Sequence, residues 1–498
     1  MKFLHKLITK IEPPNWVMAI ITGVIVLRIP SLFEPYYYGD EMIYLTLGNA
    51  IRKGITLYSQ IHDNKPPLLY VTAAVAGNLF WFKAILMFWM LATIIIFWHL
   101  SEELFKNSLP TQAGKLAQKI SVAIFAILTT LPLFEGNIAN AELFLIGPII
   151  LGILILLKNP SNKNIFLAGL SFAVATLFKV PAIFDVPVIV VFWLISLKDI
   201  NFKDILEVTK KTLILAAGLA IPIVLTLIWY FLKGAGSDYV KAAFLQNIGY
   251  LSSWSGGPKV SFVTKNGPLL IRAGVVLIGF IALRVYNRRL SKPFLISSIW
   301  LLTSLFAATL SARPYPHYLI QAAPAISILI AILVTSPKLE QVITILPLTL
   351  AVIVPVYYHF WYYSTSTYYE RFLGFATHQI SKEAYFNKFN SQTTNNYKTS
   401  QKIQNLVMPN DKMFVWGEDA PVIYALSRRL PAIKYAANYH ITDFSSTSEV
   451  LKQLKANPPS LIVILSNSPK FEGLPNLLSS KYVKLESVGA EIWHLLAH

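Results

Sequence analysis

Two short polar stretches after the first apolar segment hold the residues best suited to chemistry. Asp40 and Glu41 stand together, Tyr44 follows one helical turn later, and Lys65 comes directly before two prolines. A carboxylate at the boundary of water and lipid can serve as a general base, because burial tunes its pKa. Asp40 is therefore our candidate base, with Glu41 and Tyr44 as substrate contacts. A structural alternative stays open, since Asp favours the N-cap and Glu the first turn of the helix expected over residues 40–53.

Lys65 has a side chain whose direction is set by its neighbours. The prolines at positions 66 and 67 fix the local backbone and bias the preceding residue toward an extended conformation. We interpret Lys65 as a ligand for the phosphate of a lipid-linked substrate; the alternative is a lysine that snorkels above an interfacial helix. His62 and Asp63 nearby are metal-binding types, but two adjacent ligands indicate a metal only weakly. A divalent metal is compatible with these residues, and no metal ligand is assigned.

Two further charged side chains mark the ends of expected membrane helices. Glu142 begins an apolar segment, and a carboxylate that enters a membrane helix is costly and by default a functional candidate. We assign it to catalysis, with helix capping or snorkelling as the alternative. Lys179 ends another apolar segment and is a candidate substrate ligand, with an interface anchor as the alternative.

A second polar motif, Arg313-Pro314-Tyr315-Pro316-His317-Tyr318, lies between two apolar segments. Its two prolines argue against a helix, and irregular backbone at membrane depth usually lines a cavity. The arginine suits a phosphate or pyrophosphate. We therefore expect Arg313, His317 and Tyr318 to bind substrate, although an arginine with aromatic residues also suits an interface belt.

The composition places these residues in a membrane protein. Of the 498 residues, 55% are hydrophobic and 14% are charged, against about 25% charged in soluble domains. The net charge of +18 fits cytoplasmic loop cations and a face that binds anionic lipid phosphates. Nucleic acid is not an expected partner, since no basic soluble module with interleaved aromatic residues is visible. The chain has no cysteine, which excludes disulfides and thiolate chemistry.

Apolar spans of about 20 residues, compared with loop lysines and arginines, predict eleven crossings of the plasma membrane and a cytoplasmic N-terminus. The expected crossings are 15–33, 84–100, 119–134, 140–158, 164–179, 182–197, 212–231, 267–284, 293–311, 319–336 and 341–361. The transmembrane domain would be residues 1–361, with outer loops 34–83 and 233–267. Within the first loop, residues 68–82 form a segment that dips into the interface without crossing. This topology rests on loop charge, and it places all the candidate residues on the outer face.

The composition changes after residue 361. Residues 362–498 are rich in polar and charged side chains, and no span there is long enough to cross. A strand at 412–417, a helix at 420–429 and a buried strand at 461–465 predict a small α/β domain. The odd number of crossings makes this domain extracytoplasmic.

The chain resembles the glycosyltransferase-C superfamily, and within it the bacterial family 39 branch of protein-mannosyltransferase-like and aminoarabinose-transferase-like enzymes. The resemblance covers residues 30–430. It is carried by Asp40-Glu41 with Tyr44, Lys65-Pro66-Pro67-Leu68, Glu142, Lys179, Arg313 to Tyr318, and Phe414-Val415-Trp416-Gly417 with Tyr424. It implies a glycosyltransferase-C fold and an inverting transferase that takes a sugar from a polyprenyl phosphate on the non-cytoplasmic face. The acceptor would be a protein, a lipid or a cell-envelope glycan.

The resemblance also implies residue roles. Asp40 matches a base that acts on the acceptor or orients it, Lys65 matches a contact to the donor phosphate, and Glu142 matches an acid in the same cavity. Two departures concern the donor side, since Lys83 lies near the place of a frequent arginine and Asn64 stands where some relatives carry an acid.

Two alternative functions remain. The first is an oligosaccharyltransferase-type transferase, against which counts the lack of a Trp-Trp-Asp motif after residue 361. The second is a transporter or flippase of lipid-linked glycans, which would place its ionisable residues near mid-membrane.

Overall fold

The computed structural model describes residues 13–249, 262–311, 313–336, 338–466, 468–485 and 489–496. The chain forms two compact units. The first, here called the bundle unit, comprises Met1–Ile29, Ile85–Thr226 and Gln246–Thr365. The second, here called the sheet unit, comprises Pro30–Ala84, Leu227–Leu245 and Ser366–His498. The expected first outer loop, residues 34–83, therefore lies within the same compact unit as the C-terminal α/β region.

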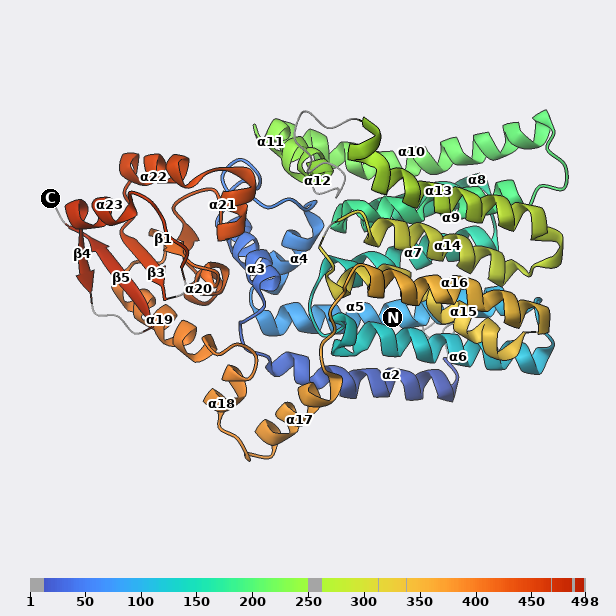
Figure 1. The fold of residues 1–498 in the computed structure, drawn as a ribbon, viewed down its shortest axis with the longest axis horizontal. Coiled ribbons are helices and arrows are strands. Elements are labelled where there is room, and N and C mark those ends of the chain that lie inside the picture. The colour runs from blue at the N-terminus through green and yellow to red at the C-terminus, as the bar shows by residue number, and fades with distance from the viewer. Residues whose placement is uncertain are drawn as a thin grey trace, which may run out of the picture. The chain divides into compact units, whose positions relative to one another are not determined.

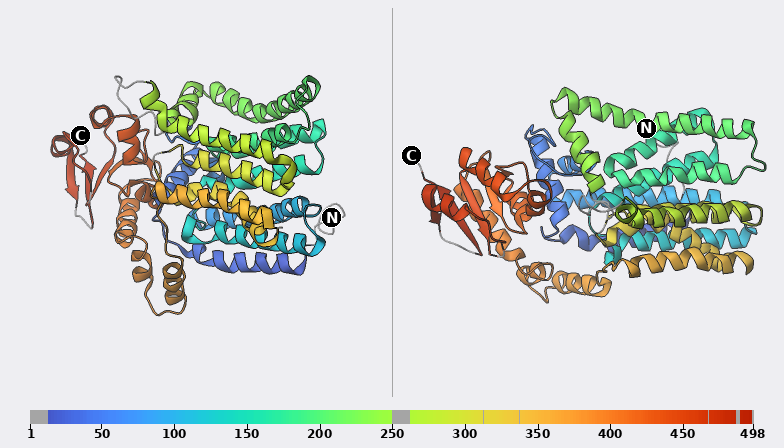
Figure 2. Two further views of the ribbon diagram at one scale, coloured as in Figure 1. Left: turned by 45° about the vertical axis from the view of Figure 1, so that its right-hand side comes forward. Right: turned by 45° about the horizontal axis from the view of Figure 1, so that its top comes forward.

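The bundle unit consists of helices that run side by side (Figures 1 and 2). Its principal helices, with α5 and α10 given over their full lengths, are α2 (Asn15–Arg28), α5 (Leu79–Phe105), α6 (Thr111–Thr130), α7 (Ala141–Lys158), α8 (Asn162–Phe178), α9 (Pro187–Ile195), α10 (Phe202–Leu232), α13 (Phe262–Tyr286), α14 (Lys292–Ala308), α15 (Ala323–Thr335) and α16 (Lys338–Tyr357). Among the described residues, seven helical stretches are long and apolar enough to cross a membrane, and three shorter apolar helices accompany them. Each expected crossing falls on a helix, so the predicted polytopic α-helical fold is confirmed.

Glycine brings α8 and α10 into close backbone contact. A Cβ atom added to Gly169 would lie 2.3 Å from the carbonyl oxygen of Leu215, and one added to Gly218 would lie 2.2 Å from that of Phe166. Such contacts are typical of membrane helices, which associate through close packing because lipid offers no hydrophobic driving force between them. A side chain larger than hydrogen at either glycine would push the two helices apart.

The segment expected to dip into the interface is divided into two elements. Helix α4 (Leu68–Ala76) ends at Gly77, whose φ of 71° is the left-handed conformation that often terminates helices. Helix α5 then begins at Leu79, five residues before the expected second crossing, which lies wholly within this helix. The nine residues of α4 span roughly 13 Å, too little to cross a hydrocarbon core of about 30 Å.

The expected second outer loop, residues 233–267, contains short helices. They are α11 (Gly236–Val240), a π-helical turn (Lys241–Leu245) and α12 (Gln246–Gly249). Residues 250–261 of this loop lie outside the described residues.

The sheet unit contains a five-stranded sheet in the order β2-β1-β3-β5-β4. Its strands are β1 (Lys412–Trp416), β2 (Leu430–Pro431), β3 (Leu461–Leu465), β4 (Tyr482–Leu485) and β5 (Ala490–Leu495). β2, β1 and β3 are parallel, whereas β5 is antiparallel to both β3 and β4. The predicted α/β domain is confirmed, including both expected strands and helix α20 (Ala420–Ser427) between them. Strands β2, β4 and β5 were not predicted from the sequence.

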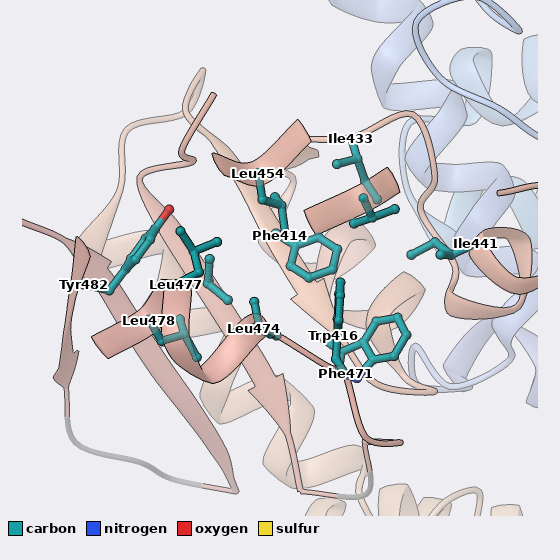
Figure 3. Packing of buried hydrophobic residues seen from close by; sticks show 12 residues of the cluster. Phe414, Trp416, Ile433, Ile441, Leu454, Phe471, Leu474, Leu477, Leu478 and Tyr482 are labelled. Carbon is teal, nitrogen blue, oxygen red and sulfur yellow. The ribbon is translucent and has the colours of Figure 1, made fainter. Parts of the chain in front are cut away.

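An aromatic and aliphatic core holds the sheet against its helices (Figure 3). Phe414 and Trp416 stack with ring centroids 6.3 Å apart, and Phe471 lies 4.8 Å from Trp416. All three are at least 95% buried, and full burial of such a side chain contributes roughly 1.5–3 kcal/mol. The apolar run of β3 is buried because this strand lies inside the sheet, between β1 and β5.

The described part of the sheet unit also contains further helices. They are α3 (Gly39–Arg52), α17 (Thr365–Ala376), α18 (Lys382–Asn387), α19 (Thr393–Leu406), α21 (Asn438–Phe444), α22 (Thr447–Ala456) and α23 (Leu474–Lys481). Helix α3 packs directly on α4. The contact is so close that a Cβ atom on Gly48 would lie 2.7 Å from the backbone of Ala73 and Ala74. This close approach fixes the helix that carries Asp40 relative to the segment that follows Lys65.

Candidate functional site

A carboxylate, a phenol and an amine meet at the start of α3. The Tyr44 hydroxyl donates a 2.9 Å hydrogen bond to Oδ2 of Asp40, and the Lys65 Nζ lies 3.9 Å from the same oxygen. The N-cap of α3 is Tyr38, so Asp40 does not have the capping role that was its structural alternative. Asp40 keeps 29% of its side chain exposed and Lys65 keeps 16%, which leaves both groups accessible to a substrate.

Two buried tyrosines hold the backbone of Lys65 from both sides. Tyr58 donates a 2.9 Å hydrogen bond to the Lys65 carbonyl, and the Tyr70 hydroxyl accepts one of 3.1 Å from the Lys65 amide. Burial, aided by neighbouring tyrosines and Asp63, raises the pKa of both phenols well above the ordinary value, so both stay protonated. The direction of Lys65 therefore depends on these hydrogen bonds as well as on the two prolines.

Asp63 connects Lys65 to the α/β region. Its Oδ2 lies 3.8 Å from the Lys65 Nζ, and its Oδ1 lies 3.4 Å from Nε2 of His440 in α21. The side chains of Asp63 and His440 are each only 1% exposed. Burial alone would raise the pKa of Asp63, but the charge of Lys65 and the hydrogen bond with His440 outweigh it and hold the pKa well below the ordinary value. Asp63 is thus a fixed anion beside Lys65.

His62 anchors the loop without a charge. Its amide donates a 2.8 Å hydrogen bond to the carbonyl of Lys434, and the two segments form a parallel bridge at Tyr435. Burial, with a smaller contribution from His440, lowers the pKa of His62 to about 3, so the ring is neutral at pH 7. Among the described residues, no group of three or more histidine, cysteine or acidic side chains is arranged to hold a metal.

Glu41 lies in a separate, buried network of the sheet unit. Its Oε1 is 3.0 Å from the Nζ of Lys83, which also lies 2.6 Å from Glu34. Tyr368 donates a 2.5 Å hydrogen bond to the other oxygen of Glu34. Glu41 is 0% exposed, and these contacts suit a residue that holds α3 in place. The expected contact between Glu41 and substrate stays a prediction.

In the bundle unit, Glu142 and Lys179 form an ion pair. Glu142 lies in the first turn of α7, whose N-cap is Asn140, and Lys179 is the C-cap residue of α8. The Lys179 Nζ donates to Oε1 of Glu142 and also lies 3.9 Å from the ring centroid of Tyr318. Burial leaves only 3% of the glutamate side chain and 16% of the lysine exposed. Lys179 therefore contacts two other predicted site residues, Glu142 and Tyr318.

His317 belongs to a second buried pair next to α7. Its Nδ1 contacts Oε2 of Glu135, the same oxygen that accepts a 3.1 Å hydrogen bond from Asn140. Glu135 has a φ of 58°, an uncommon conformation for a residue other than glycine. This buried carboxyl group was missed, although its place beside Gly136, between two apolar segments, was a signal that could have found it.

The backbone around Arg313 differs from the expectation. Residues Pro316–Ala322 form the 3₁₀ helix η6, so His317 and Tyr318 lie on a helix and not on irregular backbone. The physical reason is the position of Pro316, which opens the helix where a missing amide proton costs nothing. Among the three candidate residues of this motif, Arg313 is the one on irregular backbone; it is half-buried, and its amide donates a hydrogen bond to the Ser311 hydroxyl.

A buried aspartate supports both of these elements. Asp185 ends the 3₁₀ helix η3 (Val180–Asp185), which follows Lys179 directly. It accepts hydrogen bonds from Ser304 (2.9 Å) and from Gln321 of η6 (2.8 Å), and Gln321 also donates to Pro181 (3.1 Å). The segment with Lys179 is thereby fixed to the one with His317 and Tyr318. Sequence reasoning missed Asp185, although a lone acid in an apolar run was the available signal.

Comparisons with solved structures identify this fold. The crystal structure of ArnT from Cupriavidus metallidurans bound to undecaprenyl phosphate is 15% identical, with a TM-score of 0.58 over 97% of this chain and 98% of that chain. The same protein in the apo state is 14% identical, with a TM-score of 0.56 over 96% and 97%. The chain therefore has the fold of the ArnT structures, and the expected glycosyltransferase-C fold is confirmed.

A further solved structure is less similar to this chain. The crystal structure of an oligosaccharyltransferase from Archaeoglobus fulgidus, tethered with an acceptor peptide, covers 91% of this chain and 69% of that chain at 12% identity. Its TM-score of 0.43 is too low to carry an argument. No protein-family model and no curated protein matches the sequence.

Proposed function

We propose that this chain is a membrane glycosyltransferase that moves a sugar from a polyprenyl-phosphate donor to an acceptor on the non-cytoplasmic face. The observation that carries the proposal is the Asp40 carboxylate, hydrogen-bonded by Tyr44 and 3.9 Å from the amine of Lys65. A partly exposed base beside a fixed cation is the pairing that attack on a phosphate-linked sugar needs. The ArnT structure with the same fold binds undecaprenyl phosphate, which supports a lipid phosphate as the donor class.

In the proposed step, an acceptor hydroxyl or amine attacks the anomeric carbon and gives its proton to Asp40. The bond between the anomeric carbon and the phosphate oxygen breaks, and the lipid phosphate leaves with the bonding electrons. Attack opposite the leaving group inverts the anomeric configuration. Lys65 stabilises the charge that develops on the phosphate, and a lysine already fixed by Asp63 loses little freedom when it does so.

The polar residues of the bundle unit are proposed to take part as well. Glu142 keeps its proposed catalytic role, and Lys179 and Tyr318 bind substrate as parts of the same contact group. Arg313 and His317 precede Tyr318 closely in the sequence. Their side chains, which are cationic or can form hydrogen bonds, suit an anionic ligand.

The experiment that tests the function names the donor and the acceptor together. Cells that lack the chain are complemented with the wild type, with Asp40→Asn or with an empty vector, and their lipid-linked sugars and envelope glycans are compared by mass spectrometry. A transferase predicts that the donor accumulates and one glycosylated product disappears with both the empty vector and Asp40→Asn. Accumulation of an unchanged lipid-linked glycan on the cytoplasmic side, with no product of transfer, would favour a flippase.

A further inference from the structure

We infer that a cleft in the sheet unit binds a saccharide and serves as an acceptor subsite, an inference that rests on the proposed transferase function. The cleft has a volume of about 530 Å³ and is lined by residues of helices α18, α19 and the end of α20. Figure 1 labels these three helices. All three helices belong to the sheet unit, and none of the residues assigned above to catalysis or donor binding lines the cleft.

The walls of the cleft combine amide groups with aromatic rings. Gln401 and Gln404 lie at exposed positions on α19. The Gln404 amide already donates a 3.0 Å hydrogen bond to the Leu426 carbonyl, but an amide has a second N–H and an oxygen besides. The Gln401 amide can both donate and accept hydrogen bonds. The rings of Phe386 and Tyr397 lie beside the two glutamines, with centroids 5.1 Å apart. A pyranose has hydroxyl groups around its edge and C–H groups on its faces, so it matches amides and aromatic rings at the same time.

The charges around the cleft favour a sugar over a phosphate. Lys382, Lys398 and Glu383 line it, and Glu383 lies 3.8 Å from Lys398, with both of these side chains more than half exposed. Glu383 offsets one of the two lysines, and the other, Lys382, lies 5.3 Å from the ring centroid of Phe386. The cations of the lining are therefore not gathered around a single anion-binding point. A phosphate ligand would favour a cluster of unopposed cations, and a lipid chain would favour an apolar lining.

Tyr397 connects the cleft to the segment that leads to Asp40. Its hydroxyl accepts a 3.1 Å hydrogen bond from the amide of Tyr36, four residues before the proposed base. The Tyr36 hydroxyl in turn accepts one from the amide of Leu79. A saccharide that stacks on Tyr397 therefore contacts a side chain that also fixes the segment from Tyr36 to Asp40. We expect this placement for an acceptor rather than for a donor lipid.

The test measures saccharide binding to the full-length protein in nanodiscs, without donor. The probes are neutral tetrasaccharides of glucose, mannose and N-acetylglucosamine and a serine- and threonine-rich decapeptide, examined by saturation-transfer NMR and thermophoresis. At least one tetrasaccharide is expected to bind. Gln401→Ala should weaken this binding about fivefold and Phe386→Ala about tenfold, as expected for one hydrogen bond and one stacked ring. Gln453→Ala on α22 is the matched control and should bind as the wild type does.

Three results would overturn the inference: no tetrasaccharide binds, binding ignores both cleft variants, or the decapeptide binds in the cleft instead. Should Phe386→Ala fail to fold, the exposed Gln401 still carries the test. A wild-type chain that binds saccharide in the cleft but never transfers sugar refutes the proposed function alone. A chain that transfers sugar but has no binding in the cleft refutes this inference alone.

Discussion

His440 lies 3.4 Å from Asp63, and this contact joins the α/β region to the loop that presents Lys65. Asp63 stands between the histidine and the lysine, and both Asp63 and His440 are almost completely buried. An anion in this position holds the charge of Lys65 in one place, which a long and flexible lysine side chain would not do by itself. The α/β region thus has a direct part in shaping the proposed donor site.

Asp63→Asn should destabilise the protein at neutral pH. Removing one partner of a buried ion pair typically costs about 3 kcal/mol or more, since the other charge is left without compensation. The pKa of Asp63 is lower in the folded state, so its contribution is fully present above the ordinary pKa of about 4 and is lost as pH falls through the folded value. The difference in Tm between wild type and variant should therefore be constant from pH 7 to 5 and shrink only below pH 4. A difference that disappears between pH 7 and 5 would contradict this assignment.

Asp40→Asn should reduce the rate of sugar transfer about 10²-fold or more, because the amide cannot accept the acceptor's proton. Binding of the polyprenyl-phosphate donor should remain within about twofold. Asp199→Asn, at an exposed position elsewhere in the chain, is the matched control. Turnover of Asp40→Asn near the wild-type rate in a purified assay would exclude Asp40 as the base.

Lys65→Ala should weaken donor binding about tenfold or more, since it removes the cation proposed to meet the phosphate. It should also leave Asp63 without its nearby cation, so Tm is measured in parallel to separate the two effects. Lys470→Ala, at an exposed position of the sheet unit, is the control. If donor affinity is unchanged while Tm falls, Lys65 has only a structural role.

Glu142 and Lys179 should behave as a coupled pair. Glu142→Gln and Lys179→Met each leave one member of a largely buried ion pair uncompensated, so each alone should be strongly destabilising. A double-mutant cycle compares the free energy lost in each variant, measured from thermal unfolding or from donor affinity. The loss in the double variant should be smaller than the sum of the two single losses by about 1 kcal/mol or more. Additive losses would show that the two side chains do not act together.

The lack of cysteine makes the predicted topology easy to test. Ser479→Cys in α23 and Asn107→Cys between α5 and α6 each introduce a single thiol at an exposed position. In intact cells, a membrane-impermeant maleimide should label the first, whereas the second should require permeabilisation. Labelling of Asn107→Cys in intact cells would invert the arrangement.

Helix α3 and the membrane helices were predictable because local signals specify them. Apolar runs of about 20 residues locate the crossings, and the acidic pair at positions 40 and 41 marks the start of α3 to within one residue. The two prolines that follow Lys65 likewise indicated that its backbone conformation is fixed. The misassigned backbone around His317 shows the limit of such signals, because a proline that interrupts a helix can equally open one.

The partners of these residues were not predictable, because they come from distant parts of the chain. Nothing near Asp63 in the sequence points to His440, and nothing near Glu41 points to Lys83 within an apolar run. Such contacts depend on tertiary packing and leave no periodic pattern. Asp185 differs in one respect: its partners were not predictable, but the residue itself could have been singled out, because a lone acid in an apolar segment is costly.

The parallel bridge between His62 and Tyr435 also dictates an order of events during synthesis. Its two segments lie roughly 370 residues apart, and translation at about 5–20 residues per second separates their appearance by about 20–75 s. During that interval most of the membrane helices can be inserted, but the loop with Lys65 still lacks the segment that fixes it. The nascent chain would therefore gain a competent donor site only after almost all of it has been made, which delays transfer until the fold is nearly complete.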